Sequence, residues 1–148
     1  MTGVVFHYGV TDKWDYAIRL VRKAVRSGFR VRVALAPAEL ANFSARLWAM
    51  APTGFFAHCD DQAPASLRRR SPVILGAAGG SDEPQAAVLL NLTHDTPESP
   101  QRYGKILEVI TTDPHDRQQG RIRKRAYDSA RYPVAMHDAG AAQTAGVP

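Results

Sequence analysis

The alternation of short apolar runs with longer amphipathic segments predicts an α/β domain with a largely parallel sheet. The short runs have the length and composition of strands, and the longer segments repeat their apolar residues every three or four positions, as on one face of a helix. Strands that alternate with helices in this way imply parallel pairing. The 148 residues are one domain's worth of chain, with 45% hydrophobic and 22% charged residues.

The start of the chain is expected to hold two strands around one helix. Residues 4–8 (VVFHY) predict a short strand, and Asp12 suits the N-cap of a helix that Gly28 ends. Residues 30–35 alternate charged and apolar side chains before turning apolar, which suits a strand near one edge of the sheet. The apolar residues of the helix predict one buried stripe, made of Trp14, Ile18, Val21 and Val25.

A second helix and a third strand are expected next. Pro37 suits the first turn of a helix that ends near Trp48, and residues 55–58 read as a short strand. Between this strand and the next lies a polar stretch that ends in three arginines. The inner face of the helix is expected to carry Leu40, Phe43 and Leu47.

The second half of the chain completes the predicted domain. Its last helix is expected from Asp116 to about Ala130, and it follows the last strand. The domain is expected to span residues 1–138, because residues 139–148 (AGAAQTAGVP) have too little apolar bulk to pack and predict a disordered tail. The strands of this half are expected at 72–77, 87–92 and 105–112.

Composition predicts a cytoplasmic protein that is not embedded in a membrane. No apolar run approaches the length of a bilayer span, and the first residues lack the features of a signal peptide. Cys59 is the single cysteine of the chain, so no intramolecular disulfide is possible.

No convincing catalytic, cofactor or metal motif is present in the sequence. The Gly-rich segment GAAGGSDE lacks both the GxGxxG spacing and the Lys-Ser or Lys-Thr pair of a phosphate loop. The run from His58 to Asp61 resembles a metal cluster, but neighbouring strand residues point to opposite faces and do not converge on one ion. Nothing in the sequence places a histidine and an orienting group beside Cys59. We therefore expect no catalytic residues, no cofactor and no metal.

The last predicted helix carries the strongest charge signal. The formal net charge is +5, and residues 117–125 (RQQGRIRKR) hold five basic groups and no acid. Ile122 and Ala126, on the opposite side, are expected to face the core. The basic face is either a solvated surface or an anion site in which arginine forks meet a carboxylate or phosphate. It consists of Arg117, Arg121, Lys124 and Arg125, spaced as i, i+4, i+7 and i+8.

Two aromatic residues also allow two interpretations. Trp48 follows Leu47 and so lies off the inner stripe of its helix, while Phe55 adjoins Phe56 in a predicted strand. They are either core residues or an exposed aromatic patch of the kind that anchors protein interfaces. Residue statistics alone favour the core.

Taken together, these segments resemble the chi subunit of bacterial DNA polymerase III holoenzyme, over residues 1 to about 138. The resemblance rests on the order and spacing of these segments. The last helix departs from the family pattern: it is more basic here, with Lys124 where an aromatic is usual and Ile122 where an acid is usual. The segments are DKWDYAIRLVRKAVRSGFRVRV, LWAMAPTGFFAH, PVILG, AVLLNL and GRIRKRAY.

The resemblance implies a Rossmann-like fold without nucleotide chemistry and a non-catalytic protein with two binding surfaces. One surface would receive the acidic, aromatic-ended C-terminal tail of single-stranded DNA-binding protein. The other would bind the psi subunit of the clamp loader or an accessory helicase through Trp48 and Phe55, which favours their exposure. The tail would contact Arg117, Arg121, Lys124 and Arg125, with Ile110 as an apolar neighbour.

The resemblance also sets the expected assembly. The protein would be a monomer within a hetero-complex at the replisome and would meet DNA mainly indirectly. Two other functions remain open from the residues alone. A direct nucleic-acid binder would use the same basic helix on phosphates, although that helix lacks interleaved aromatics for base stacking. A small α/β enzyme would need a catalytic cluster that we do not find.

Overall fold

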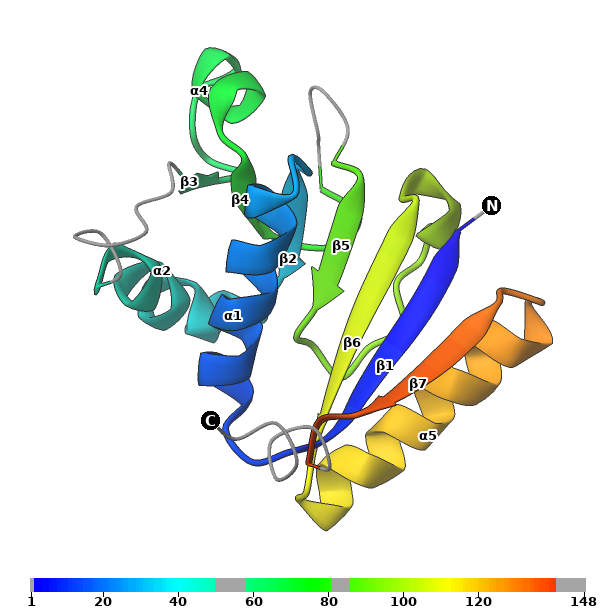
Figure 1. The fold of residues 1–148 in the computed structure, drawn as a ribbon. Helices are drawn as coiled ribbons and strands as arrows, with labels where there is room; N and C mark the ends of the chain where they lie inside the picture. The colour runs from blue at the N-terminus through cyan, green and yellow to red at the C-terminus, as the bar shows by residue number, and fades with distance from the viewer. Residues whose placement is uncertain (1, 50–57, 81–85, 141–148) are drawn as a thin grey trace.

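The computed structural model describes residues 2–49, 58–80 and 86–140, and these residues form a Rossmann-like α/β domain (Figure 1). Its sheet has seven strands in the order β3-β4-β2-β5-β6-β1-β7, and every pair of neighbours is parallel. The predicted fold class is confirmed. The strands are β1 (Gly3–Val10), β2 (Val31–Ala34), β3 (His58–Asp60), β4 (Val73–Gly76), β5 (Val88–Asn91), β6 (Lys105–Thr111) and β7 (Val134–Asp138).

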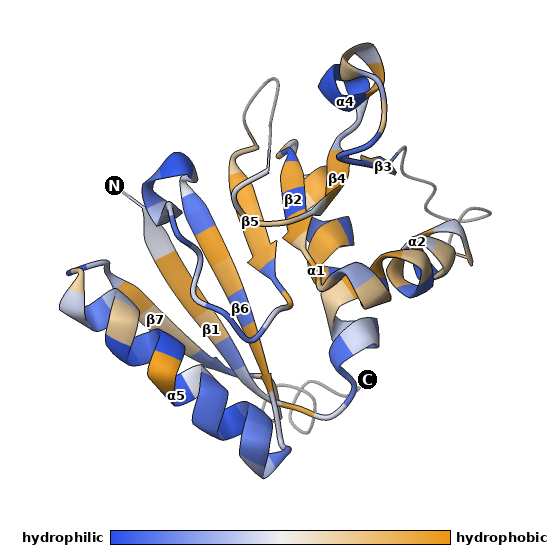
Figure 2. Cartoon of the chain, turned by 180° about the vertical axis from the view of Figure 1, so that it is seen from behind, coloured by the Kyte–Doolittle hydropathy of each residue, from blue (hydrophilic) through white to orange (hydrophobic). Residues whose placement is uncertain are grey.

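Helices cover the two faces of the sheet unequally. On one face, α1 and α2 pack over an apolar core, and on the other α5 packs behind β6, β1 and β7 (Figure 1). Seen from behind, α5 is largely hydrophilic, whereas the strands beneath it are hydrophobic (Figure 2). The helices are α1 (Lys13–Arg26), α2 (Leu40–Ala49), α4 (Ala65–Arg70) and α5 (Pro114–Ser129), with short 3₁₀ turns at Pro37–Glu39 and Pro100–Arg102.

The capping residues and the apolar spacing in the sequence predicted the position of α1 correctly. The Asp12 side chain accepts a hydrogen bond from the backbone N–H of Asp15 at 3.1 Å, as expected of an N-cap. Gly28, just past the end of the helix, has a φ of +88°, a conformation that glycine adopts without strain. Ile18 and Val21 are buried in the middle of the predicted stripe.

The expectation that residues 30–35 form a strand near an edge is wrong. β2 lies in the interior of the sheet between β4 and β5, and Arg32 is fully buried rather than solvent-exposed. Its guanidinium donates to both carboxylate oxygens of Asp61, at 2.8 and 2.9 Å, and to the carbonyl of Ala77 at 3.0 Å. Gly76 leaves room for this pair, because a Cβ there would overlap the Asp61 carboxylate. The charge of Arg32, which suggested an edge strand, is thus paired with Asp61 inside the protein.

The structure differs from the sequence expectations in three further places. The strand ending at residue 112 is not the last, because β7 follows α5 and pairs with β1. β7 is an edge strand whose residues are mostly exposed, so it lacks the continuous apolar run that marked the other strands. The polar stretch before β4 contains the short helix α4. β3 begins at His58, where the predicted strand ended, and residues 55–57 lie outside the described part of the chain.

The end of the described chain is partly packed. Ala139, the first residue of the predicted tail, is buried in the core beneath α1 and α2, and residues 141–148 lie outside the described part. Within the described residues, none of the helices has the length and apolar character needed to cross a membrane.

Candidate functional site

Two local features stabilise the N-terminus of the basic helix α5. The Asp113 side chain accepts a hydrogen bond from the backbone N–H of Asp116 at 3.0 Å, and Pro114 occupies the first helical position. Asp116 in turn accepts from the backbone N–H and the hydroxyl of Thr111, at 2.7 and 2.9 Å, which ties the helix to the end of β6. The first turn of α5 is therefore held against the sheet.

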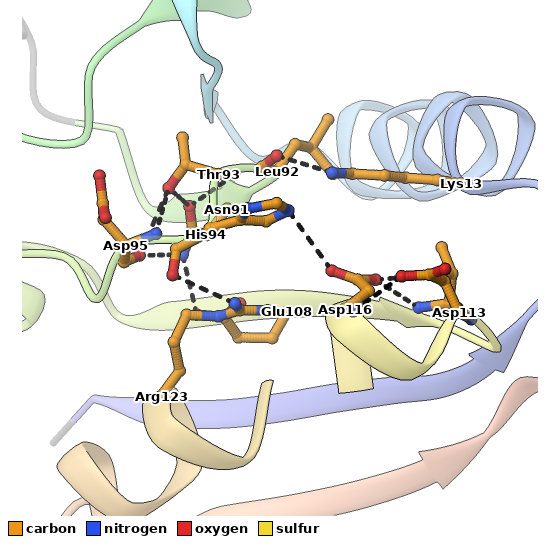
Figure 3. A network of polar contacts seen from close by, with 11 residues as sticks. Lys13, Asn91, Leu92, Thr93, His94, Asp95, Glu108, Asp113, Asp116 and Arg123 are labelled. Carbon is orange, nitrogen blue, oxygen red and sulfur yellow. Dashed lines mark hydrogen bonds and ion pairs between the residues drawn. The ribbon is translucent and has the colours of Figure 1, made fainter. Parts of the chain in front are cut away.

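The inner face of α5 is polar rather than apolar. Arg123 is 1% exposed, and its Nε donates to Oε1 of the fully buried Glu108 on β6 at 2.9 Å (Figure 3). Oε2 of Glu108 accepts from the hydroxyl of Tyr127 at 2.7 Å and from Nδ2 of Asn91 at 3.0 Å. The expectation that Ile122 and Ala126 face the core is wrong, since both are exposed, Ile122 by 48%.

This polar cluster fixes which face of α5 points toward the sheet. Burial, together with the negative charge of Glu108, raises the pKa of Tyr127, so its hydroxyl stays protonated and remains a donor. The Arg123 guanidinium also donates through Nη1 to the carbonyl of His94 at 3.3 Å, in the segment after β5. Because Arg123 must point inward, the residues on the other side of α5 point outward.

The structure brings three of the predicted tail-binding residues into one groove. This groove has a volume of about 390 Å³ and lies where β1 and β6 end beside the first turns of α5. Ile110 is 8% exposed and belongs to its floor, while Arg117 and Arg121 are exposed on its helical wall. The rest of the lining comes from Tyr8, Gly9, Thr111, Thr112, Met136 and Asp138.

The other two predicted residues lie beside this groove rather than in its lining. Lys124 forms an ion pair with Asp128 at 2.8 Å, one turn further along the helix. Arg125 is exposed one turn beyond Arg121. The concentrated positive charge at the groove is therefore that of Arg117 and Arg121.

Sequence reasoning missed two apolar members of the groove, Tyr8 and Met136, which are 37% and 49% exposed. Tyr8 was placed in the first strand, and the alternation from Phe6, which packs under α5, would have put it on the same face. Met136 had no such signal, because β7 was not predicted.

A glycine allows the floor of the groove to approach the helix. A Cβ at Gly120 would overlap the Ile110 side chain, so only glycine lets that side chain pack directly against the α5 backbone. The groove thus combines an apolar floor with two arginine forks. Such a site can hold a carboxylate that is covalently joined to an apolar or aromatic group.

The second predicted surface lies at the opposite end of the sheet, next to β3. Trp48 is 51% exposed at the end of α2, and its ring centroid lies 5.1 Å from that of His58. His58 forms a hydrogen bond from Nε2 with the Ser44 hydroxyl at 2.9 Å. The exposed interpretation of Trp48 is confirmed, whereas Phe55 lies outside the described residues.

The suspected metal cluster does not assemble around this strand. Cys59 is buried, and the carboxylate of Asp61 is held by Arg32. Within residues 2–49, 58–80 and 86–140, no three histidine, cysteine or acidic side chains are grouped so that they could hold a metal ion.

Comparison with known proteins gives two matches that span most of the chain. The family model described as "DNA polymerase III chi subunit, HolC" matches residues 1–135, from the N-terminus into β7. The DNA polymerase III subunit chi of Pseudomonas aeruginosa is 30% identical over 126 residues, which cover 82% of this chain and 82% of that protein. The chain therefore belongs to the DNA polymerase III chi subunit family, whose members are accessory subunits in DNA replication.

Proposed function

We propose that this protein is a non-catalytic linker that joins the DNA polymerase III assembly to single-stranded DNA-binding protein in the cytoplasm. The observation that carries the proposal is the α5 groove, in which an apolar floor at Ile110 lies beside the guanidinium groups of Arg117 and Arg121. The C-terminal tail of single-stranded DNA-binding protein has the complementary chemistry: it is acidic and ends in an aromatic residue with a free carboxylate.

The binding step follows from this geometry. The basic face of α5 steers the acidic tail toward the protein, and the terminal carboxylate then pairs with an arginine fork. The terminal ring is held in the apolar part of the groove, between Tyr8, Ile110 and Met136. One such contact is weak and is screened by salt, but several tails on one DNA-bound oligomer raise the effective concentration.

The second binding surface of the linker would include Trp48, which is exposed near β3. Phe55, which lies outside the described residues, would complete it. An aromatic residue that is half exposed at a helix end is typical of the anchors at protein interfaces. The partner there would be the psi subunit or an accessory helicase. Because the two surfaces lie at opposite ends of the sheet, both partners can be bound at once.

The test is calorimetric titration with a synthetic peptide of the acidic tail. Arg121→Ala should weaken binding by about 1.5–3 kcal/mol, or roughly 10- to 150-fold, because a charge-assisted pair is lost. Arg26→Ala is the matched control, since it removes the same charge from an exposed site at the end of α1. Unchanged affinity in a folded Arg121→Ala variant would contradict the proposal.

Direct binding to nucleic acid is a second candidate, favoured by the exposed arginines at one-turn intervals, Arg117, Arg121 and Arg125. Phosphates along a backbone would use all three about equally, whereas a tail in the groove uses the first two. Arg125→Ala therefore separates the candidates. It should leave tail binding within about twofold, and it should weaken binding to a homopolymer oligonucleotide as much as Arg121→Ala if phosphates are the ligand.

A further inference from the structure

One face of the sheet is only half covered. On the α1 side, helices lie over β2, β5 and β6, while α5 packs on the far side, so no helix of the described chain covers β1 and β7 there (Figure 1). Parallel strands are normally covered on both faces. Within residues 2–49, 58–80 and 86–140, this part of the sheet therefore lacks its expected second layer.

The uncovered face is hollowed into a groove beside α1, with a volume of about 680 Å³. Its floor is apolar, because Val5 on β1 and Leu107 on β6 lie side by side in the register of the sheet. Its wall is the side of α1 that bears Leu20, and Phe29, which is 48% exposed, lies at one end. On this side of α1, Tyr16, Leu20 and Ala24 are partly buried and pack against the core cluster.

The charges around this groove are of one sign. Arg19, Lys23 and Lys105 belong to its lining, and no aspartate or glutamate of the described chain does. Arg19 is partly compensated, since its Nη2 lies 3.8 Å from the carboxylate of Asp15 and both side chains are well exposed. Lys23 and Lys105 therefore dominate the rim.

His7 lies in the same groove, close enough to Lys23 and Lys105 to be affected by their charges. Burial, followed by the positive charges of His137, Lys105 and Lys23, lowers the pKa of His7 to about 4. Nδ1 of the ring makes a 2.6 Å hydrogen bond with the Tyr16 hydroxyl. The imidazole is neutral near pH 7, and the groove presents cations to an incoming anionic segment.

The dimensions of the groove match a short helix. Its α1 wall runs from Tyr16 to Ser27, which corresponds to about 16 Å at 1.5 Å per residue. A helix of about three turns, lying beside α1, would supply the missing layer over β1 and β7.

We propose that this groove docks an acidic amphipathic helix of a partner protein, with apolar side chains on Val5, Leu20 and Leu107 and carboxylates on Lys23 and Lys105. The groove lies on the opposite face of the sheet from the α5 groove and shares no lining residue with it. This docking is an interaction beyond the tail and aromatic surfaces.

The test uses two synthetic amphipathic peptides of about 15 residues, one with leucine and glutamate and a matched one with lysine at every glutamate position. Nuclear magnetic resonance of the full chain locates the binding. The glutamate peptide should shift the amide signals of Val5, Leu20 and Leu107, and the lysine peptide should not.

Lys23→Glu/Lys105→Glu should weaken binding of the glutamate peptide at least about tenfold, because two attractive charge pairs become repulsive. Arg46→Glu/Arg70→Glu is the matched control, with the same charge change at exposed sites on α2 and α4, outside the groove, and should alter binding less than about twofold.

Several outcomes would overturn the proposal. These are no shift at the groove, shifts centred on Ile110, equal binding of both peptides, or an unchanged affinity after Lys23→Glu/Lys105→Glu in a folded protein. Equal occupation of the groove by a homopolymer oligonucleotide would assign it to nucleic acid instead. Arg121→Ala should leave glutamate-peptide shifts at Val5 and Leu107 intact, so failure of this docking and failure of the proposed tail binding are distinguishable.

Discussion

The two faces of the sheet are held in different ways. On the α1 and α2 face, the packing is a continuous apolar cluster that includes Ile18, Val21 and Phe43. On the α5 face, a smaller apolar cluster surrounds the buried Glu108–Arg123 pair. A helix whose outer face carries mostly arginines can therefore still be fixed to a sheet, because an inward arginine, its hydrogen bonds and Tyr127 take the place of an apolar stripe.

The largest expected effect is on the α5 face. Arg123→Met leaves the carboxylate of Glu108 buried without its cation, which should lower the free energy of unfolding by about 3–5 kcal/mol. Ile18→Val on the other face, which removes one methylene from the apolar core, should cost only about 0.5–1.5 kcal/mol. Urea unfolding followed by circular dichroism measures both.

Arg125→Met is the control for Arg123→Met, because it makes the same substitution two residues away at an exposed position. It should change the free energy of unfolding by no more than about 0.5 kcal/mol. If Arg123→Met were as mild as Arg125→Met, the polar cluster would contribute little and the two faces would not differ in the way described.

The same difference explains which parts were predictable from the sequence. The α1 stripe and the buried strands follow apolar periodicity, so their positions were correct. The burial of Arg32 and Arg123 was not predicted, because a charged residue is expected to be exposed unless its buried partner is known. Asp61 lies 29 residues from Arg32, and Glu108 lies 15 residues from Arg123. The pairing is a property of the folded chain and leaves no local signal.

The candidate site was predicted in part for a related reason. Arg117 and Arg121 were identified from helical spacing, and Ile110 from the family resemblance, and the structure places all three in one groove. Tyr8 and Met136 come from strands at the other side of that groove. Their proximity depends on the position of β7, an exposed edge strand with too weak a pattern to be recognised.

A smaller effect is expected on the uncovered part of the α1 face, where a histidine titrates. The pKa of His7 is lowered from its usual 6.5 to about 4, so the unfolded chain binds a proton between these values while the folded chain does not. Stability from this group is complete above pH 6.5 and is lost as the pH falls toward 4. After allowance for partial exposure, the loss should be roughly 1–2 kcal/mol.

His7→Gln should flatten this part of the pH profile, measured by urea unfolding at several pH values between 4 and 7. His115→Gln is the matched control, because that side chain is exposed in the first turn of α5. A profile that keeps its slope in His7→Gln, or loses it in His115→Gln, would assign the pH dependence to another group.

The smallest effect tests whether a change on one face reaches the other. Trp48 lies beside β3 and α5 packs on β6, four strands away in the sheet, which corresponds to roughly 20 Å at 4.8 Å per strand. The two apolar clusters lie on opposite faces of the sheet and have no residue in common. Sites separated by more than about 7–10 Å without shared partners usually act additively, to within about 0.5 kcal/mol.

Trp48→Ala should therefore change the affinity for the acidic tail peptide by less than about 0.5 kcal/mol, while it weakens capture of the psi-like or helicase partner. Arg121→Ala should do the reverse, and calorimetry with each variant, after circular dichroism confirms folding, compares them. Loss of both partners in either folded variant would mean that the sheet couples its two ends, and the two surfaces would then be one cooperative site.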